Sequence, residues 1–137
     1  MNSLSQSPLA QYRCVGAYGN VETADSHGLV SLLYDGLSEA LSATRGAIER
    51  RDVGAKVKEI HKAISILEAL RSSLNMDEGG EMALNLDSLY EFMSGQITQA
   101  NLHDDVAAIE SSIAVNETLR EAWSSIPEDA RRGSMAA

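Results

Sequence analysis

Histidines, the cysteine and the paired carboxylates are the residues of this chain that could carry catalysis or hold a metal. His27, His61 and His103 fall at a helix start, on a helix edge and in a turn of the expected fold. A di-iron helical bundle needs Glu-x-x-His pairs on facing helices, and the sequence contains none. We therefore interpret all three histidines as solvated or locally hydrogen-bonded, and we expect no metal site.

The remaining reactive groups give no positive reason for catalysis. Cys14 is the single cysteine, so it can form no disulfide within the chain, and no histidine near it in sequence could activate it. Asp104 and Asp105 could form a paired acid site, but helix capping explains them better. Phosphate-loop, Cys-x-x-Cys and Gly-x-Ser-x-Gly motifs are all absent. We expect a protein that is not an enzyme and needs no cofactor.

Composition fits one domain with an ordinary apolar core. The chain has 137 residues, of which 44% are hydrophobic, and a formal net charge of −9. Its cation pairs, Arg50-Arg51 and Arg131-Arg132, are isolated, so binding to nucleic acid or to an anionic membrane surface is disfavoured. No segment has the apolar length of a signal peptide or a membrane span. We expect a cytoplasmic protein.

The elements that position these residues are four helices between Pro8 and Pro127. Strands are unlikely because aromatic residues are few and β-branched runs are absent. Similar helix lengths and short connections predict an all-α, antiparallel up-down four-helix bundle. The expected helices cover residues 26–50, 53–74, 81–100 and 106–125. Residues 1–24 form an N-terminal segment packed on the bundle of residues 25–126, and residues 127–137 form a flexible tail.

Capping residues and glycines mark the predicted boundaries. Asp25 and Asp52 are suited to cap the first two helices, and Asp104 or Asp105 to cap the last. Gly79-Gly80 permits a tight reversal, after which Glu81 favours the start of the third helix. The segment 101–103 is expected to be a turn.

Two helices show an ordinary core stripe. At 100° per residue, apolar side chains of the second and third expected helices each gather on one side. The two stripes comprise Val53, Val57, Ile60, Ile64, Leu67, Leu70 and Leu74, and Met82, Leu86, Leu89, Met93, Ile97 and Ala100.

The first and last helices each carry a second stripe, so their apolar arcs span roughly 200°. The second stripes comprise Val30, Leu37, Leu41 and Ile48, and Ala108, Val115, Leu119, Ala122 and Trp123. Two interpretations remain open and are compatible. The extra width is covered by the chain itself, through a central helix or the N-terminal segment, or it forms a groove for another polypeptide. Tyr12, Val15 and Tyr18 suit such a cover.

Several stretches, in this order and spacing, resemble the family of flagellar secretion chaperones (FliS). The resemblance runs over about residues 15 to 125 and includes an Ala-Tyr at 17–18, a leucine-rich segment ending in Leu-Tyr-Asp-Gly at 33–36, and a Leu-Arg-Glu-Ala-Trp at 119–123. Further matching segments are 21–24, 62–67, 79–86, 89–93 and 100–105. Asp25-Ser26 stands where the family has Ser-Pro, a change that preserves helix initiation.

The resemblance implies a cytoplasmic chaperone that binds the disordered C-terminal region of flagellin. It would prevent early polymerisation and deliver the client to the flagellar type III export apparatus, without a cofactor. Val15 and Tyr18 match the family's apolar contact residues in the N-terminal segment. Together with the second stripes they give the expected client contacts, which are Val15, Tyr18, Val30, Leu37, Leu41, Val115, Leu119 and Trp123.

A different class of function remains as the alternative. The second stripes could instead join two copies of the chain, which would make it a self-associating helical adaptor with no flagellin client. The expected state in solution is a monomer or a weak homodimer.

Overall fold

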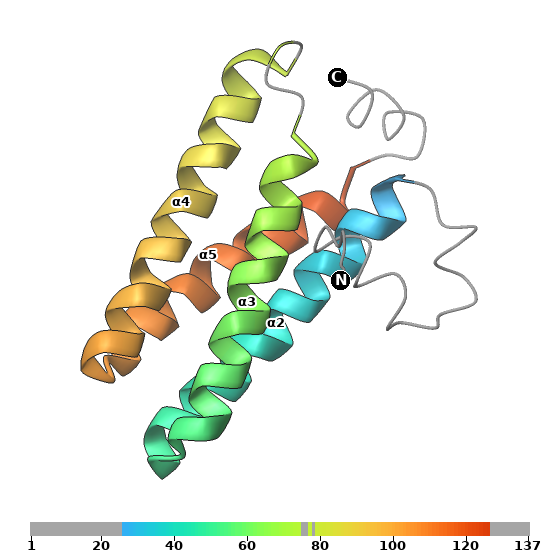
Figure 1. Cartoon of the computed structure of the whole chain (residues 1–137). Helices are drawn as coiled ribbons and strands as arrows, with labels where there is room; N and C mark the ends of the chain where they lie inside the picture. Colours follow the sequence, from blue (N-terminus) through green and yellow to red (C-terminus); the bar gives the residue numbers. More distant parts are fainter. Residues whose placement is uncertain (1–25, 75–76, 78, 127–137) are drawn as a thin grey trace, which may run out of the picture.

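The computed structural model describes residues 26–74, 77 and 79–126, and this part of the chain forms four helices without a strand. They are α2 (Ser26–Arg50), α3 (Val53–Ser72), α4 (Gly80–His103) and α5 (Val106–Ser124). Successive helices run in opposite directions, and their contacts close a ring in the order α2, α3, α4, α5 (Figure 1). The prediction of an all-α up-down four-helix bundle is confirmed.

Both terminal segments lie outside the described residues. The N-terminal cover at 1–24, the cap at Asp25 and the tail at 127–137 therefore stay predictions. The same holds for Val15 and Tyr18 as contacts of that cover.

Two of the predicted caps are present with the expected geometry. The side chain of Asp52 accepts a hydrogen bond of 3.1 Å from the amide of Ala55, at the start of α3. Asp105 accepts one of 3.2 Å from the amide of Ala108, at the start of α5. Each carboxylate satisfies an amide that the first turn of a helix leaves without a partner. Gly80 has a φ of 59°, which is the positive angle expected of the paired-glycine reversal.

The predicted turn at residues 101–103 is wrong, because α4 continues through His103. The helix ends at Asp104, which takes a left-handed conformation with a φ of 51°. The buried ammonium of Lys56 donates to the carbonyl of Asn101 at 3.2 Å and to the carboxylate of Asp104 at 2.8 Å. A cation at the C-terminus supplies a partner for the last carbonyls, so the helix gains three residues.

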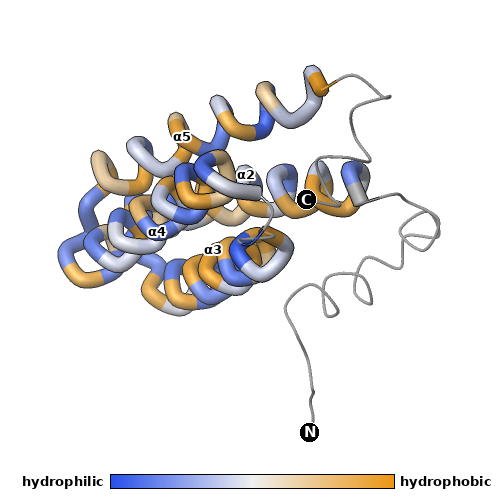
Figure 2. Tube along the Cα trace, turned by 90° about the horizontal axis from the view of Figure 1, so that it is seen from above, coloured by the Kyte–Doolittle hydropathy of each residue, from blue (hydrophilic) through white to orange (hydrophobic). Residues whose placement is uncertain are grey.

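The centre of the apolar core lies between α2 and α3. Leucines from both helices are fully buried there, and Figure 2 shows hydrophobic residues recurring along every helix. The set comprises Leu33, Leu37, Leu41, Leu67 and Leu70. Full burial of one such side chain stabilises a fold by about 1.5–3 kcal/mol. This helical hairpin therefore supplies much of the stability of the bundle.

The predicted core stripes of α3 and α4 are only partly right. Met82 and Leu89 of α4 and Val53 and Val57 of α3 are exposed. The inner side of α4 is instead centred on Tyr90, which is buried and bonded across the bundle to α2. That bond turns α4 so that the edge of the predicted stripe faces solvent.

Candidate functional site

The second apolar stripe of α2 lies in the core. Val30, Leu37 and Leu41 are all buried, because α2 packs against α3 on one side and α5 on the other. Two neighbouring helices account for a wide apolar arc on α2. A partner protein could reach these three side chains only if the bundle opened, and their contact with a client stays a prediction.

The second stripe of α5 is more accessible. Val115, Leu119 and Trp123 are partly buried and pack against the core cluster. On the opposite side of α5, Glu117 accepts a hydrogen bond of 2.9 Å from Ser38, and Arg120 pairs with an aspartate of α2. Because Val115 and Leu119 lie about 160–200° around the helix from Glu117, they face away from α2 and toward α4.

Large apolar side chains are also exposed on α4. Met82 is 71% exposed, Phe92 44% and Leu89 37%. Asp87 lies on the other side of this helix and pairs with Arg71 of α3 at 2.7 Å. At 100° per residue the three apolar side chains therefore point away from α3, toward the α5 side and solvent. The pair also raises the pKa of Arg71, chiefly through its hydrogen bond to Asp87.

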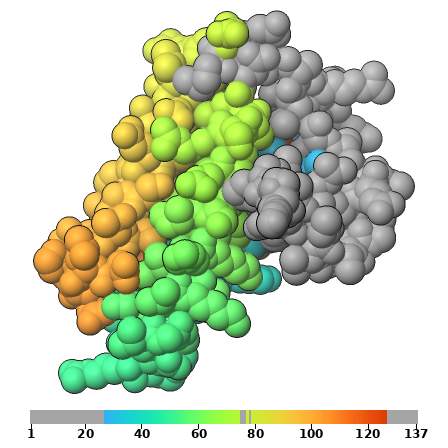
Figure 3. Space-filling view, viewed as in Figure 1, coloured from blue at the N-terminus to red at the C-terminus, as the bar shows by residue number. Residues whose placement is uncertain are grey.

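We refer to these two sets together as the α4–α5 apolar face. It comprises Met82, Leu89 and Phe92 of α4 and Val115, Leu119 and Ala122 of α5. In Figure 1, α4 and α5 lie close together at the end of α4 and diverge toward its start. Figure 3, drawn from the same side as Figure 1, shows α3 and α4 side by side, with no described helix over α4 on this side of the bundle.

Sequence reasoning assigned Met82 and Leu89 to the core and gave Phe92 no role. A signal for the exposed set was present in the composition of α4. Tyr90 and Phe92 are two positions apart, so they lie about 200° apart on a helix and cannot both face one core. The apolar arc of α4 is thus also wider than a bundle helix needs.

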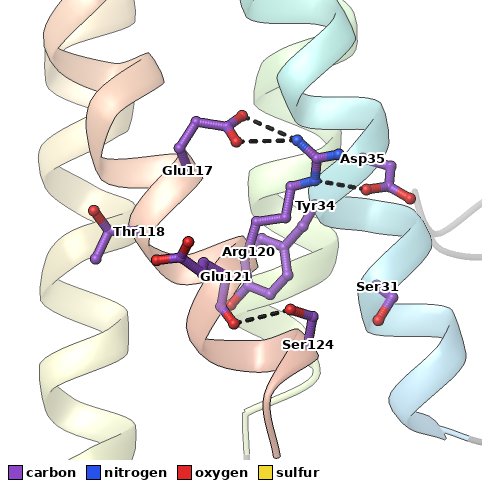
Figure 4. Close-up of a pocket in the computed structure, with 8 residues that line it drawn as sticks. All are labelled: Ser31, Tyr34, Asp35, Glu117, Thr118, Arg120, Glu121 and Ser124. Carbon is purple, nitrogen blue, oxygen red and sulfur yellow. Dashed lines mark hydrogen bonds and ion pairs between the residues drawn. The ribbon is translucent and has the colours of Figure 1, made fainter.

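A polar pocket of about 560 Å³ lies between α2 and α5. Figure 4 shows Arg120 reaching from α5 between Glu117, at 3.0 Å, and Asp35 of α2, at 2.8 Å. These carboxylates raise the pKa of Arg120, with Glu117 the largest cause. The guanidinium and both carboxylates pair with one another, so this network of ion pairs joins α2 to α5.

His27 joins the start of α2 to the end of α5. Its ring stacks on that of Trp123, with centroids 4.8 Å apart and planes 10° apart. The two residues also exchange hydrogen bonds: His27 Nε2 lies 2.8 Å from the carbonyl of Trp123, and the indole N–H donates to the carbonyl of His27 at 3.0 Å. His27 is thus locally bonded, while His61 and His103 are exposed.

Two buried tyrosines cross the bundle. The hydroxyl groups of Tyr34 on α2 and Tyr90 on α4 lie 2.6 Å apart. Burial raises the pKa of both phenols, and for Tyr90 the neighbouring Tyr34 raises it further. Both groups therefore stay protonated at any ordinary pH, which suits a structural bond rather than acid–base catalysis.

The described residues offer no metal centre and no membrane span. Nowhere in residues 26–74, 77 and 79–126 do three histidine, cysteine or acidic side chains gather closely enough to bind a metal ion. None of the four helices has the combined length and apolarity that crossing a bilayer requires.

Comparison with known proteins points to one family. Residues 9–130 match the family described as Flagellar protein FliS. The chain is 37% identical over 121 residues to the flagellar secretion chaperone FliS of Salmonella typhimurium, covering 88% of this chain and 90% of that protein. It is 35% identical to the FliS of Vibrio cholerae, over 88% and 89% of the two chains. Against the FliSB of Pseudomonas aeruginosa the identity is 36%, over 86% and 94%.

Proposed function

The chain belongs to the FliS family of flagellar secretion chaperones, and from this premise we propose that it binds the C-terminal region of flagellin in the cytoplasm. Binding would keep the client from polymerising before export. The complex would then deliver flagellin to the flagellar type III export apparatus. The role requires neither catalysis nor a cofactor.

The observation that carries this proposal is the α4–α5 apolar face. Large apolar side chains exposed together on a protein surface usually mark a site where another chain binds. Met82, Leu89 and Phe92 are exposed at helical spacing on α4, and Val115 and Leu119 are half-buried on the side of α5 that faces α4. A client helix could lay its own apolar side along this face, in the manner of other helix-binding proteins.

The predicted contacts divide into three groups under this proposal. Val115, Leu119 and Trp123 belong to α5. The first two would touch the client directly, and Trp123, stacked on His27, would hold the end of α5. Val15 and Tyr18 would act from the N-terminal segment, which would cover apolar surface in the absence of client. Val30, Leu37 and Leu41 would contribute only where the bundle opens, since they are buried in the unbound fold.

The charge of the chain fits a protein partner. With a net charge of −9, the chain would repel nucleic acid and anionic lipid, so we propose neither as a partner. Apolar contact would then supply most of the binding energy for flagellin.

Isothermal titration calorimetry against a peptide from the C-terminal region of the cognate flagellin tests the proposal. Binding should show a negative heat-capacity change, because apolar surface is buried. The variant Leu89→Ser/Phe92→Ser should bind at least about tenfold more weakly, a loss of about 1.4 kcal/mol.

Leu84→Ser is the matched control, because Leu84 is an exposed leucine on the same helix. It is 57% exposed and lies about 140° around α4 from Leu89. Its affinity for the peptide should equal that of the unchanged chain. Absence of measurable heat at about 50 μM peptide would count against the flagellin client, since that range still detects weak specific binding.

Self-association is the second candidate, because the same α4–α5 apolar face could bury itself against a second copy. Light scattering over a dilution series separates the two functions. A dimer that persists when flagellin peptide is added, and that Leu89→Ser/Phe92→Ser abolishes, would favour the adaptor.

A further inference from the structure

Two polar atoms on α5 are buried without a hydrogen-bond partner among the described residues. They are Ser112 Oγ and Asn116 Oδ1, and both residues are almost completely buried. The residues lie four positions apart, so their side chains are neighbours on the inward side of the helix. A buried oxygen without a partner costs about 1–3 kcal/mol, so two in adjacent turns call for a ligand.

Ser112 differs from other hydroxyl residues in these helices. Four of them donate to the carbonyl four residues earlier, at 2.7–3.1 Å, namely Thr44, Ser72, Thr98 and Thr118. The carbonyl of Ala108 stands in the same relation to Ser112, yet no such bond forms. The Ser112 hydroxyl therefore keeps both its hydrogen and its lone pairs available for another group.

The amide of Asn116 is oriented by a neighbouring helix. Its Nδ2 donates to the main-chain carbonyl of Tyr34 at 3.2 Å. Reversal of the amide would bring two oxygens together at that point and leave two N–H groups without acceptors. Oδ1 therefore faces the side of the core where it needs a donor.

Thr44 of α2 can supply further hydrogen-bonding capacity. It precedes Arg45, which pairs at 3.7 Å with Glu110 of α5, two residues before Ser112. Thr44 is fully buried, and because its hydrogen goes to Ala40, its oxygen remains able to accept. A water molecule suits these three groups, because it can donate two hydrogen bonds and accept two.

We propose that Ser112 and Asn116 hold an internal water molecule in the core of the bundle, with Thr44 as its third partner. The water donates to Asn116 Oδ1 and to Thr44 Oγ1 and exchanges a hydrogen bond with Ser112 Oγ. Three partners are the usual number for a buried water.

This water site fixes how α5 sits on α2. Apolar side chains tolerate small shifts along a helix, whereas a bridged polar group has partners in one register only. Sliding or turning α5 would break the bridge and leave Ser112 Oγ and Asn116 Oδ1 buried without partners. The position of α5 also sets the position of Val115 and Leu119 on its outer side.

Water-to-protein NMR transfer on the full chain, together with high-resolution diffraction, tests the site. We expect a long-lived water at Ser112 and Asn116. Ser112→Ala should abolish its signal and raise the unfolding equilibrium constant about fivefold, the net effect of one lost hydrogen bond.

Ser111→Ala is the control, because it removes a hydroxyl from the same turn at a residue that is only half-buried. It should retain the water and the stability. Absence of a long-lived water, its persistence in Ser112→Ala, or an unchanged or increased stability of that variant would each overturn the proposal. Increased stability of Ser112→Ala would show that the Ser112 hydroxyl has no hydrogen-bond partner in the folded protein.

Discussion

The α2–α3 hairpin and the α5 helix bury very different side chains. Between α2 and α3 the core is made of fully buried leucines. The inward side of α5 has Ile109 as its one large fully buried aliphatic residue among residues 106–124, alongside Ala108, Ser112 and Asn116. Its remaining large apolar residues are partly exposed. The α2–α3 hairpin therefore stabilises the fold through buried leucines, whereas α5 leaves part of its apolar surface exposed to solvent.

The connections of α5 are correspondingly polar. Arg45, Ser38 and Asp35 of α2 bond to Glu110, Glu117 and Arg120 of α5. Exposed pairs of this kind contribute little stability, about 0–1 kcal/mol each. What they do supply is orientation, because they turn Val115 and Leu119 toward α4. The leucine core and the outer side of α5 are thus held by different kinds of contact.

Leu37→Ala should give the largest effect and would test the hairpin as the source of stability. Removing a fully buried leucine side chain costs about 2–5 kcal/mol, including the cavity that it leaves. Urea unfolding followed by circular dichroism measures the loss. Phe92→Ala is the control, because its exposed ring should change stability by only about 0.5 kcal/mol. If both variants lost the same free energy of unfolding, the leucine core and the α4–α5 apolar face would contribute equally to stability.

Alkaline pH should produce the next largest effect, through Tyr34 and Tyr90. Burial raises both folded pKa values above the ordinary value of 10.0, whereas the unfolded chain ionises near that value. Stability is thus complete below pH 10 and falls above it, because only the unfolded chain releases these protons. The limiting slope is about 1.4 kcal/mol per pH unit for each tyrosine.

Tyr90→Phe separates this effect from other alkaline titrations. Basic side chains of the chain also titrate at alkaline pH, so the unchanged chain alone does not isolate the tyrosines. Urea unfolding at pH 8 and pH 11 should show a smaller alkaline loss for Tyr90→Phe than for the unchanged chain. An equal loss of stability between pH 8 and pH 11 in both proteins would mean that ionisation of Tyr90 does not contribute to that loss.

Trp123→Phe should have a moderate effect and would test how the open end of α5 is held. The variant keeps a ring to stack on His27 but removes the N–H that donates to the His27 carbonyl. The expected cost is about 1 kcal/mol, typical of one hydrogen bond. Hydrogen exchange should quicken in the last turn of α5 and the first turns of α2. Uniform quickening over all four helices would place Trp123 in the central core instead.

Sequence patterns predicted the number of helices, their order and most of their ends, because periodicity and capping are local properties. Asp52 and Asp105 act as predicted since a cap involves residues three apart. The end of α4 was missed because it depends on Lys56, 45 residues away from Asn101. No local signal could reveal that contact.

The α4–α5 apolar face was harder to predict than the fold. An apolar stripe shows that a helix has a buried side, but not how the helix is turned about its axis. The bond between Tyr34 and Tyr90 sets that rotation for α4, and it joins residues 56 positions apart. Met82 and Leu89 were therefore assigned to the core although they are exposed. Val115 and Leu119 were assigned to a second stripe from their spacing alone, and they are partly buried in the structure.

Asp35→Asn should have the smallest effect and tests whether the polar contacts of α5 orient rather than stabilise. The guanidinium of Arg120 would keep its bonds to Glu117, so the cost in unfolding free energy should stay under about 1 kcal/mol. Adding salt should shrink the difference from the unchanged chain, because the pair is partly exposed. A loss above about 2 kcal/mol that salt does not reduce would mean that the pair is a strong buried interaction. In that case α5 would be held as firmly as the α2–α3 hairpin, and the contrast between the two regions would lie only in their exposed side chains.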